Sequence, residues 1–151
     1  MSRARAGALL ASALRILLGY VAASLAGAVT AMLLTLIVTA ADSDPQLPLL
    51  LAGALFSAPF AALFVGYLAL VPGAMAIILA EALSIRRWPF FAVAGLAAGA
   101  WFVAMATAPG DPPAQPGSVA AILGIGCASG LAYWLAAGRR SGAWKAVSAP
   151  R

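Results

Sequence analysis

The sequence predicts an all-α integral membrane protein, a four-helix bundle with its N-terminus and C-terminus both in the cytoplasm. Three observations predict this class. First, 64% of the 151 residues are hydrophobic, and the mean hydropathy is +1.02. Second, only 9% of the residues are charged, whereas about a quarter are charged in soluble domains. Third, long uncharged runs alternate with short segments that hold nearly all of the charge.

The positive charges are segregated along the chain. The nine Lys and Arg residues form three clusters, and three of the four acids (Asp42, Asp44 and Asp111) lie in the two segments between them. Cytoplasmic loops of membrane proteins carry an excess of Lys and Arg, so we expect the three clusters to be cytoplasmic. This pattern explains the net charge of +5 without nucleic-acid binding, which needs cations gathered on one folded face. The cations are Arg3, Arg5, Arg15, Arg86, Arg87, Arg139, Arg140, Lys145 and Arg151.

The first predicted span covers about residues 14–40. Its uncharged run, Ile16 to Ala41, is too long for the apolar segment of a signal peptide, which has about 7–15 residues, so we expect an uncleaved helix. A polar turn with two acids and two prolines follows at 42–48. Hydroxyl groups in the span can donate to carbonyls one turn back and so cost little in lipid. These residues are Ser24, Thr30, Thr35 and Thr39.

The second predicted span, about residues 48–84, is longer than a bilayer requires. The run from Pro45 to Ala80 holds 36 residues without a charge. As one helix it would be about 54 Å long, against a hydrocarbon core of about 30 Å. Pro59 and Pro72 each remove a backbone donor and crowd the carbonyl four residues back. We favour one tilted helix kinked at these prolines. The alternative is a break at Pro72 followed by a separate interfacial helix.

The remaining spans are predicted at about 89–108 and 118–138, on either side of a loop rich in Pro and Gly. Ser118 is a suitable N-cap for the last span. The tail, 139–151, is predicted to be cytoplasmic, and mobile after Ser141. The whole chain therefore forms one transmembrane domain. Aromatic and basic residues border the spans as interfacial anchors. These anchors are Trp88, Tyr133, Trp134, Arg86, Arg87, Arg139 and Arg140.

Glu81 is the one acid outside the predicted outer turns. Ionisable groups within membrane segments are energetically costly and often functional. The expected role of Glu81 is a surface or interhelical ion pair, and the alternative is proton coupling or substrate binding. A buried Glu81 with no cation within reach would favour the alternative. The candidate partners are Arg15, Arg86, Arg87 and Arg139.

Small residues recur at a spacing of four in three of the predicted spans. Lipid provides no hydrophobic force between helices, so close backbone approach matters for their association. We expect these stripes to pack helices within the chain, and the alternative is an oligomer interface. The glycines are Gly19 and Gly27 on either side of Ala23, Gly95 and Gly99, and Gly126 and Gly130.

The residue types argue against most catalytic and cofactor sites. The chain has no His, and Cys127 is its single cysteine, so the usual haem and metal ligands and an intrachain disulfide are missing. The sequence holds no Ser–His pair, no paired carboxylates on one helix and no phosphate-binding glycine loop followed by Lys. We therefore expect no enzyme activity, no cofactor, no haem or metal and no nucleic-acid partner.

The segment from Tyr133 to Gly142 resembles the end of small uncharacterised four-span proteins of proteobacterial inner membranes. The segments 72–81 and 85–95 are similar to the central turn of those proteins. The resemblance covers about half of the chain, and it implies the same topology and a bacterial cytoplasmic membrane. It implies no activity and adds no functional residues. Small multidrug antiporters fit worse, because they need a glutamate in the first span, where this chain has no acid.

The leading functional hypothesis is a non-catalytic accessory, assembly or stabilising subunit of a larger inner-membrane complex. Its expected partners are membrane lipids and other membrane-protein subunits, or a second copy of itself. The hypothesis rests on the near absence of polar groups inside the spans, the small-residue stripes and the lack of soluble mass. The alternative is a small oligomeric transporter or channel that uses the kinked second helix and Glu81. A polar lumen would favour this alternative, and a continuous apolar interior would oppose it.

Overall fold

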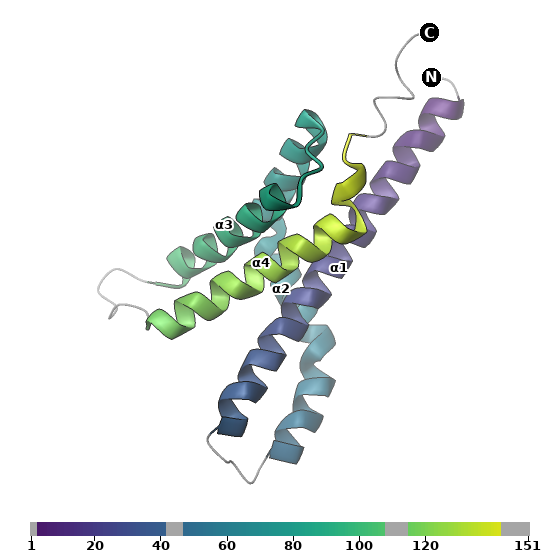
Figure 1. Cartoon of the computed structure of the whole chain (residues 1–151). Coiled ribbons are helices and arrows are strands. Elements are labelled where there is room, and N and C mark those ends of the chain that lie inside the picture. The colour runs from purple at the N-terminus through teal and green to yellow at the C-terminus, as the bar shows by residue number, and fades with distance from the viewer. Residues whose placement is uncertain (1–2, 42–46, 108–114, 143–151) are drawn as a thin grey trace.

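The computed structural model is all-helical over the residues that it describes, which are 3–41, 47–107 and 115–142 (Figure 1). Four of its helices are long and apolar enough to cross a membrane, which confirms the predicted fold class at this level and fits a multi-pass membrane protein. The acids of the two outer turns, and the tail beyond residue 142, lie outside the described residues. The elements are α1 (Arg3–Ala41), α2 (Leu47–Leu83), α3 (Trp88–Ala106), α4 (Pro116–Ala136) and the 3₁₀ helix η1 (Gly138–Arg140).

α1 begins earlier than predicted, and α2 is continuous through both of its prolines. α1 begins well before residue 14, because its first residues are mainly Ala, Leu and Arg, which favour helix whether or not they enter lipid. α2 is one α-helix of 37 residues that contains both Pro59 and Pro72. The alternative of a break at Pro72 is therefore wrong. A proline inside a membrane helix is tolerated because its neighbours satisfy the freed backbone groups. The kinks themselves stay a prediction.

The prediction that Ser118 caps the last helix is wrong. α4 begins at Pro116, and Gln115 is its N-cap residue. Proline suits the first helical position, because its missing N–H would have no partner there and its fixed φ already matches the helix. Ser118 consequently lies inside the first turn of α4. α3 starts in a similar way, with Arg87 as its N-cap residue and proline in its first turn.

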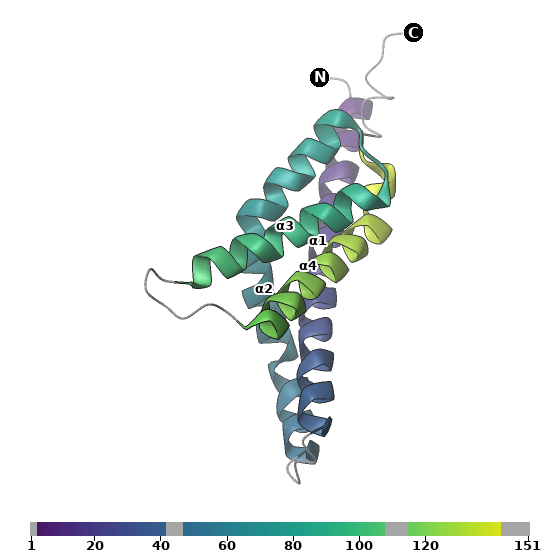
Figure 2. The same ribbon diagram turned by 60° about the vertical axis from the view of Figure 1, so that its left-hand side comes forward.

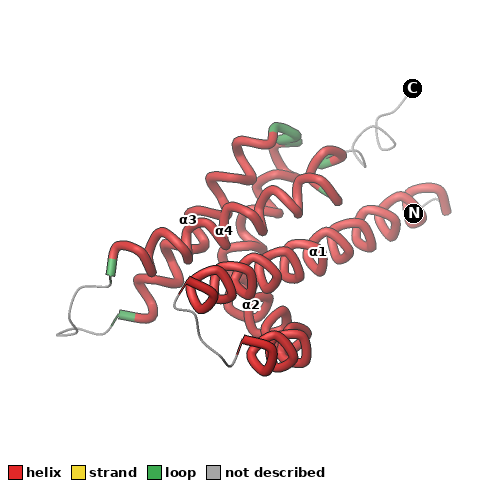
Figure 3. The backbone as a smooth tube through the Cα atoms, turned by 60° about the horizontal axis from the view of Figure 1, so that its bottom comes forward, coloured by secondary structure: helices red, strands yellow, loops and turns green. Residues whose placement is uncertain are grey.

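The helices form two unequal pairs. α3 and α4 lie side by side along their length (Figures 1, 2 and 3). α1 packs on both α4 and α2, whereas α2 has much less contact with α3. α1 and α2 have 39 and 37 residues, about twice the 19 and 21 residues of α3 and α4. Their far halves therefore project beyond the α3–α4 pair (Figures 1 and 2). We call this projecting part, residues 32–41 and 47–63, the arm.

The start of α1, the turn from α2 to α3 and the end of α4 lie at one end of the molecule (Figure 1). We call this the charged end, because the α2–α3 turn brings Arg86 and Arg87 there and η1 brings Arg139 and Arg140. The core lies close to it, as a cluster of Ala80, Phe91, Tyr133 and Ala137. Elsewhere most large apolar side chains are exposed, as expected when lipid is the solvent.

Hydroxyl side chains within α1 bond to their own helix, as predicted. Ser24 Oγ donates to the Tyr20 carbonyl at 3.0 Å, and Thr30 Oγ1 donates to the Ala26 carbonyl at 2.7 Å. Thr35 Oγ1 donates to a carbonyl four residues back in the same way, at 3.0 Å. These bonds satisfy the donors inside an apolar helix. The side chain of Thr39, for which the same bond was predicted, lies outside the described residues.

Candidate functional site

Glu81 lies near the end of α2 and joins three parts of the chain. Its Oε1 is 3.7 Å from Nη2 of Arg15 on α1, and the two side chains are 13% and 19% exposed. Its Oε2 accepts a hydrogen bond from the backbone N–H of Gly142 at 2.7 Å. The ion pair expected for Glu81 is observed, and Arg15 is the partner among the four candidates. Both carboxylate oxygens of Glu81 are therefore engaged in holding α1, α2 and the segment after η1 together.

Two further hydrogen bonds tie the α2–α3 turn to the end of α4. Arg86 Nε donates to the Ser141 carbonyl at 3.0 Å, and Trp134 Nε1 donates to the Arg86 carbonyl at 2.8 Å. The guanidinium carbon of Arg139 lies 4.5 Å from the centre of the Trp134 ring, within the range of a cation–π contact. Arg86 and Trp134 thus connect parts of the chain that are distant in sequence, and their predicted role as interfacial anchors stays a prediction.

Two residues with positive φ meet at this end. Ser84 (φ +54) follows α2, and the N–H of Ile85 donates to the Ala80 carbonyl at 2.9 Å, as in a Schellman motif. Gly142 (φ +73) packs so closely on Ser84 that an added Cβ would overlap the Ser84 hydroxyl. The structural roles of Ser84, Ser141 and Gly142 were not predicted from the sequence. The Ser-Gly pair after the arginines was the available signal, because this dipeptide marks turns.

The tail begins later than predicted. Ser141 and Gly142 are both buried, and both take part in the hydrogen bonds described above. The hydrogen bonds to Arg86 and Glu81 hold this segment against the bundle, and the mobility predicted after Ser141 stays a prediction. The remainder of the predicted tail, 143–151, lies outside the described residues.

Tyr133 lies in the core, whereas the sequence suggested an aromatic belt at the membrane interface. Its side chain is 5% exposed, and its ring centroid is 5.6 Å from that of Phe91. The smallness of Gly19 makes room for it, since a Cβ at Gly19 would lie 3.1 Å from Tyr133 Cε2 and 2.6 Å from Ala137 Cβ. Trp88, Arg87 and Arg140 are exposed at the charged end, and their interfacial role stays a prediction.

The glycine stripes pack helices within the chain, as expected. A Cβ at Gly95 would overlap the Gly126 carbonyl oxygen, and a Cβ at Gly126 would overlap that of Gly95. A Cβ at Gly130 would overlap the Phe91 carbonyl oxygen, and one at Gly99 would lie 2.9 Å from that of Ile122. On α1, a Cβ at Gly27 would lie 2.5 Å from Ser129 Oγ. Glycine thus sets the spacing of α3 from α4 and of α1 from α4.

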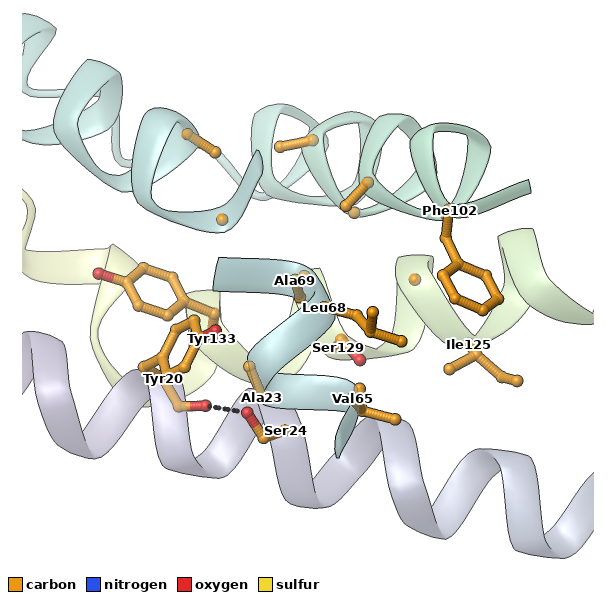
Figure 4. Close-up of a pocket in the computed structure, with 18 of the residues that line it drawn as sticks. Tyr20, Ala23, Ser24, Val65, Leu68, Ala69, Phe102, Ile125, Ser129 and Tyr133 are labelled. Atoms are coloured by element: carbon orange, nitrogen blue, oxygen red, sulfur yellow. Dashed lines mark hydrogen bonds between the residues drawn. The ribbon is translucent and has the colours of Figure 1, made fainter. Parts of the chain in front are cut away.

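A cavity of about 230 Å³ lies among the four helices, and each of them contributes to its wall. Figure 4 shows labelled wall residues from α1 (Tyr20, Ala23, Ser24), α2 (Val65, Leu68, Ala69), α3 (Phe102) and α4 (Ile125, Ser129, Tyr133). The wall is mainly Ala, Gly, Leu, Ile and Phe, and no charged residue lines it in the described part of the chain. Two of its polar side chains are satisfied internally: the Tyr20 hydroxyl donates to the Gly66 carbonyl, and Ser24 donates to its own helix.

Comparison with protein-family models, with curated proteins and with solved structures finds no match to this chain. Its function is therefore inferred from its own geometry. Within the described ranges, no group of three His, Cys, Asp or Glu side chains could hold a metal ion. The site consists of the Arg15–Glu81 ion pair and the backbone hydrogen bond from Gly142 to Glu81, with an apolar cavity nearby. Such an arrangement holds helices together and leaves an apolar space between them.

Proposed function

We propose that the chain is a non-catalytic subunit of the bacterial cytoplasmic membrane that stabilises or helps to assemble a larger membrane complex. The observation that carries the proposal is the arm. α3 and α4 do not extend along it (Figures 1 and 2), so no other helix of this chain accompanies it within the described residues. Helices of a partner, packed beside the arm, would complete the bundle there.

The arm presents aromatic side chains on one face of α2. The exposed fraction is 79% for Phe56, 63% for Phe60 and 61% for Phe64, which lies directly after the end of the arm. Their spacing of four residues places them on the same face of the helix. The rings of Phe56 and Phe60 lie 6.1 Å apart. Aromatic residues are enriched at protein interfaces, so this face is where we expect a partner helix to pack.

The alternative of a small transporter or channel receives no support from the described residues. Glu81 has a cation within reach and accepts a backbone N–H, so it is engaged in structure. The cavity wall has no charged residue in the described ranges, whereas transporter sites gather polar groups and helix ends around the substrate. The same two observations support a non-catalytic role.

The orientation belongs to the proposal as well. We infer that the charged end is cytoplasmic, because Lys and Arg are retained on that side. The resemblance to small four-span proteins of proteobacterial inner membranes supports the same orientation. Reporter enzymes that are active only in the periplasm test it. Fusions after Asp44 and Asp111 should be active, and fusions after Arg87 and Arg140 should be inactive. The opposite pattern would refute the orientation.

Purification of the intact chain at native abundance tests the accessory role. The tagged protein is extracted from its own membranes under mild conditions, and its co-migrating membrane proteins are identified. We expect a stoichiometric partner that is lost from a Phe56→Ala, Phe60→Ala double variant. A matched Val93→Ala, Leu135→Ala variant, which changes exposed positions on α3 and α4, should retain it. A chain that runs alone and conducts ions in liposomes would contradict the proposal.

A further inference from the structure

Apart from Phe64, which also lines it, the interhelical cavity has no part in the proposed function, and its size and chemistry suit a ligand. Its volume of about 230 Å³ exceeds the roughly 150 Å³ of an engineered apolar cavity that takes up benzene. Protein interiors otherwise leave few voids larger than a water molecule. The space is thus large enough for several methylene groups in a row, and its wall is almost entirely apolar.

The helix contacts indicate where this space opens. α3 is packed tightly on α4, and α1 contacts both α4 and α2, whereas α2 and α3 have the least contact of these neighbours. The walls on the two weakly packed helices carry small residues: Ala69, Gly73 and Ala76 on α2, and Ala94 and Ala98 on α3. The cavity is also not enclosed. The seam between α2 and α3 is therefore the least tightly packed side of the cavity.

The wall offers few polar groups to an occupant. The Tyr20 and Ser24 hydroxyl groups already donate to backbone carbonyls. The Ser129 hydroxyl lies against α1 at Gly27, and it has no hydrogen-bond partner within the described residues. A water or ion would find few partners here, because a buried water typically makes about three hydrogen bonds. An apolar chain needs none.

We propose that this cavity binds one hydrocarbon chain, which enters from the bilayer through the seam between α2 and α3. Two sources share this chemistry, namely the acyl chain of a membrane phospholipid and the isoprenoid tail of a lipid-soluble carrier. Either chain lies along the Ala and Gly positions of both helices. The cavity lies within this chain, so binding of the hydrocarbon does not require the proposed partner complex.

Photolabelling of the full-length protein tests the proposal. The protein is placed in bilayer discs of phosphatidylethanolamine and phosphatidylglycerol with a trace of phosphatidylglycerol that carries a diazirine in the middle of one acyl chain. Irradiation is followed by mass spectrometry of the peptides. We expect adducts on the cavity-facing residues of α2 and α3. A parallel sample with a diazirine-bearing isoprenoid, and competition by each unlabelled compound, distinguishes the two sources.

Four matched variants decide whether the label reports the cavity. Ala98→Phe and Ala69→Phe fill it from α3 and from α2, and they should lower the cavity adducts by about tenfold, equivalent to roughly 1.4 kcal/mol. Ala97→Phe and Leu70→Phe add the same side chain at neighbouring exposed positions and should leave the adducts unchanged. Circular dichroism confirms that each variant is folded, and either filling variant suffices. Equal labelling of filled and control variants, or adducts on outward-facing residues alone, would overturn the proposal.

Discussion

The α3–α4 pair and the α1–α2 pair are held together in different ways. Between α3 and α4 the backbones themselves are in contact, so that a methyl group at Gly95 or Gly126 would overlap a carbonyl of the facing helix. Between α1 and α2, side chains fill the interface: a Cβ at Gly66 would meet Ser24 Oγ at 2.9 Å, and the Tyr20 hydroxyl donates to the Gly66 carbonyl. The first interface depends on shape, and the second on individual side chains.

The difference matters because lipid supplies no hydrophobic force between helices. Close backbone contact maximises van der Waals attraction, and it makes the α3–α4 pair a unit that tolerates no added volume. The α1–α2 pair depends on side-chain contacts, and it borders both proposed binding sites, namely the arm for a partner and the cavity for a hydrocarbon chain. At the charged end, the Gly142 N–H donates to Glu81 and so links the segment after α4 to α2, while the ion pair with Arg15 joins Glu81 to α1.

The largest expected effect is at the α3–α4 interface. Gly126→Ala places a methyl group against the Gly95 carbonyl, where backbone rather than a flexible side chain must move. Overpacking typically costs about 1–3 kcal/mol, and we expect a value near the upper limit because the backbone cannot rotate away. The free energy of unfolding, measured by circular dichroism during titration of mixed micelles with dodecyl sulfate, reports the change.

Gly124→Ala is the matched control, two residues earlier on α4. Nothing lies within 4 Å of a Cβ built at Gly124. Alanine favours helix over glycine by up to about 1 kcal/mol, so this variant should be neutral or slightly more stable. Similar losses for the two substitutions would show that the α3–α4 contact does not limit stability, and the contrast between the two pairs would fail.

The next largest effect is expected where Glu81 fastens α2 to α1. Glu81→Gln retains an acceptor for the Gly142 N–H but removes the charge that pairs with Arg15. Removing one partner costs about 3–5 kcal/mol for a fully buried pair and up to about 1 kcal/mol for an exposed pair. The partial burial of both side chains places the expected loss between these ranges, at about 1–3 kcal/mol.

A double-mutant cycle with Arg15→Gln isolates the ion pair. We expect a coupling energy of about 1 kcal/mol. Arg87→Gln, which removes an exposed cation at the same end, should change stability by less than about 0.5 kcal/mol. Additive effects of Glu81→Gln and Arg15→Gln would mean that the two side chains are close without stabilising each other. The hydrogen bonds to backbone groups, and not the ion pair, would then stabilise the charged end.

Some features of this fold were predictable because they depend on composition and spacing. Hydropathy located four spans, and the glycine spacing identified Gly95 and Gly126 as positions of close helix packing, although it did not say which helices meet there. Charge segregation singled out Glu81 as the one acid that topology did not require. Each of these signals is local in sequence and follows from how lipid acts as a solvent.

Other features depend on contacts between residues far apart in sequence. The Gly142 N–H reaches Glu81 across 61 residues, and Arg86 Nε reaches the Ser141 carbonyl across 55. Tyr133 is buried because Gly19 on another helix leaves space for its ring. Hydropathy also carries no information on helix ends outside lipid, which is why the early start of α1 and the Pro116 start of α4 were missed. No local pattern encodes these pairings.

A smaller effect on the free energy of unfolding is expected where Ser84 and Gly142, both with positive φ, pack against each other. Gly142→Ala puts a Cβ into a left-handed conformation and against Ser84, so we expect a loss of about 1–2 kcal/mol of unfolding free energy. Ser84→Gly removes the overlapping hydroxyl and suits the left-handed position after α2. Combining the two should recover about half of the loss. If Ser84→Gly recovers none of the lost unfolding free energy, the overlap with Ser84 is not the cause of the loss. The loss then comes from the left-handed backbone conformation at residue 142 alone.

The smallest effect concerns a hydroxyl on α1 that donates a hydrogen bond to α2. Tyr20→Phe removes the hydrogen bond to the Gly66 carbonyl but keeps the ring at the cavity wall. Hydrogen bonds between membrane helices average about 0.6 kcal/mol, and we expect a loss of this size in the same unfolding titration. Tyr67→Phe, at an exposed position on α2, should have no measurable effect. A loss at Tyr20 as large as that of Gly126→Ala would contradict the contrast between the pairs, because one side chain would then hold α1 to α2 as firmly as backbone contact holds α3 to α4.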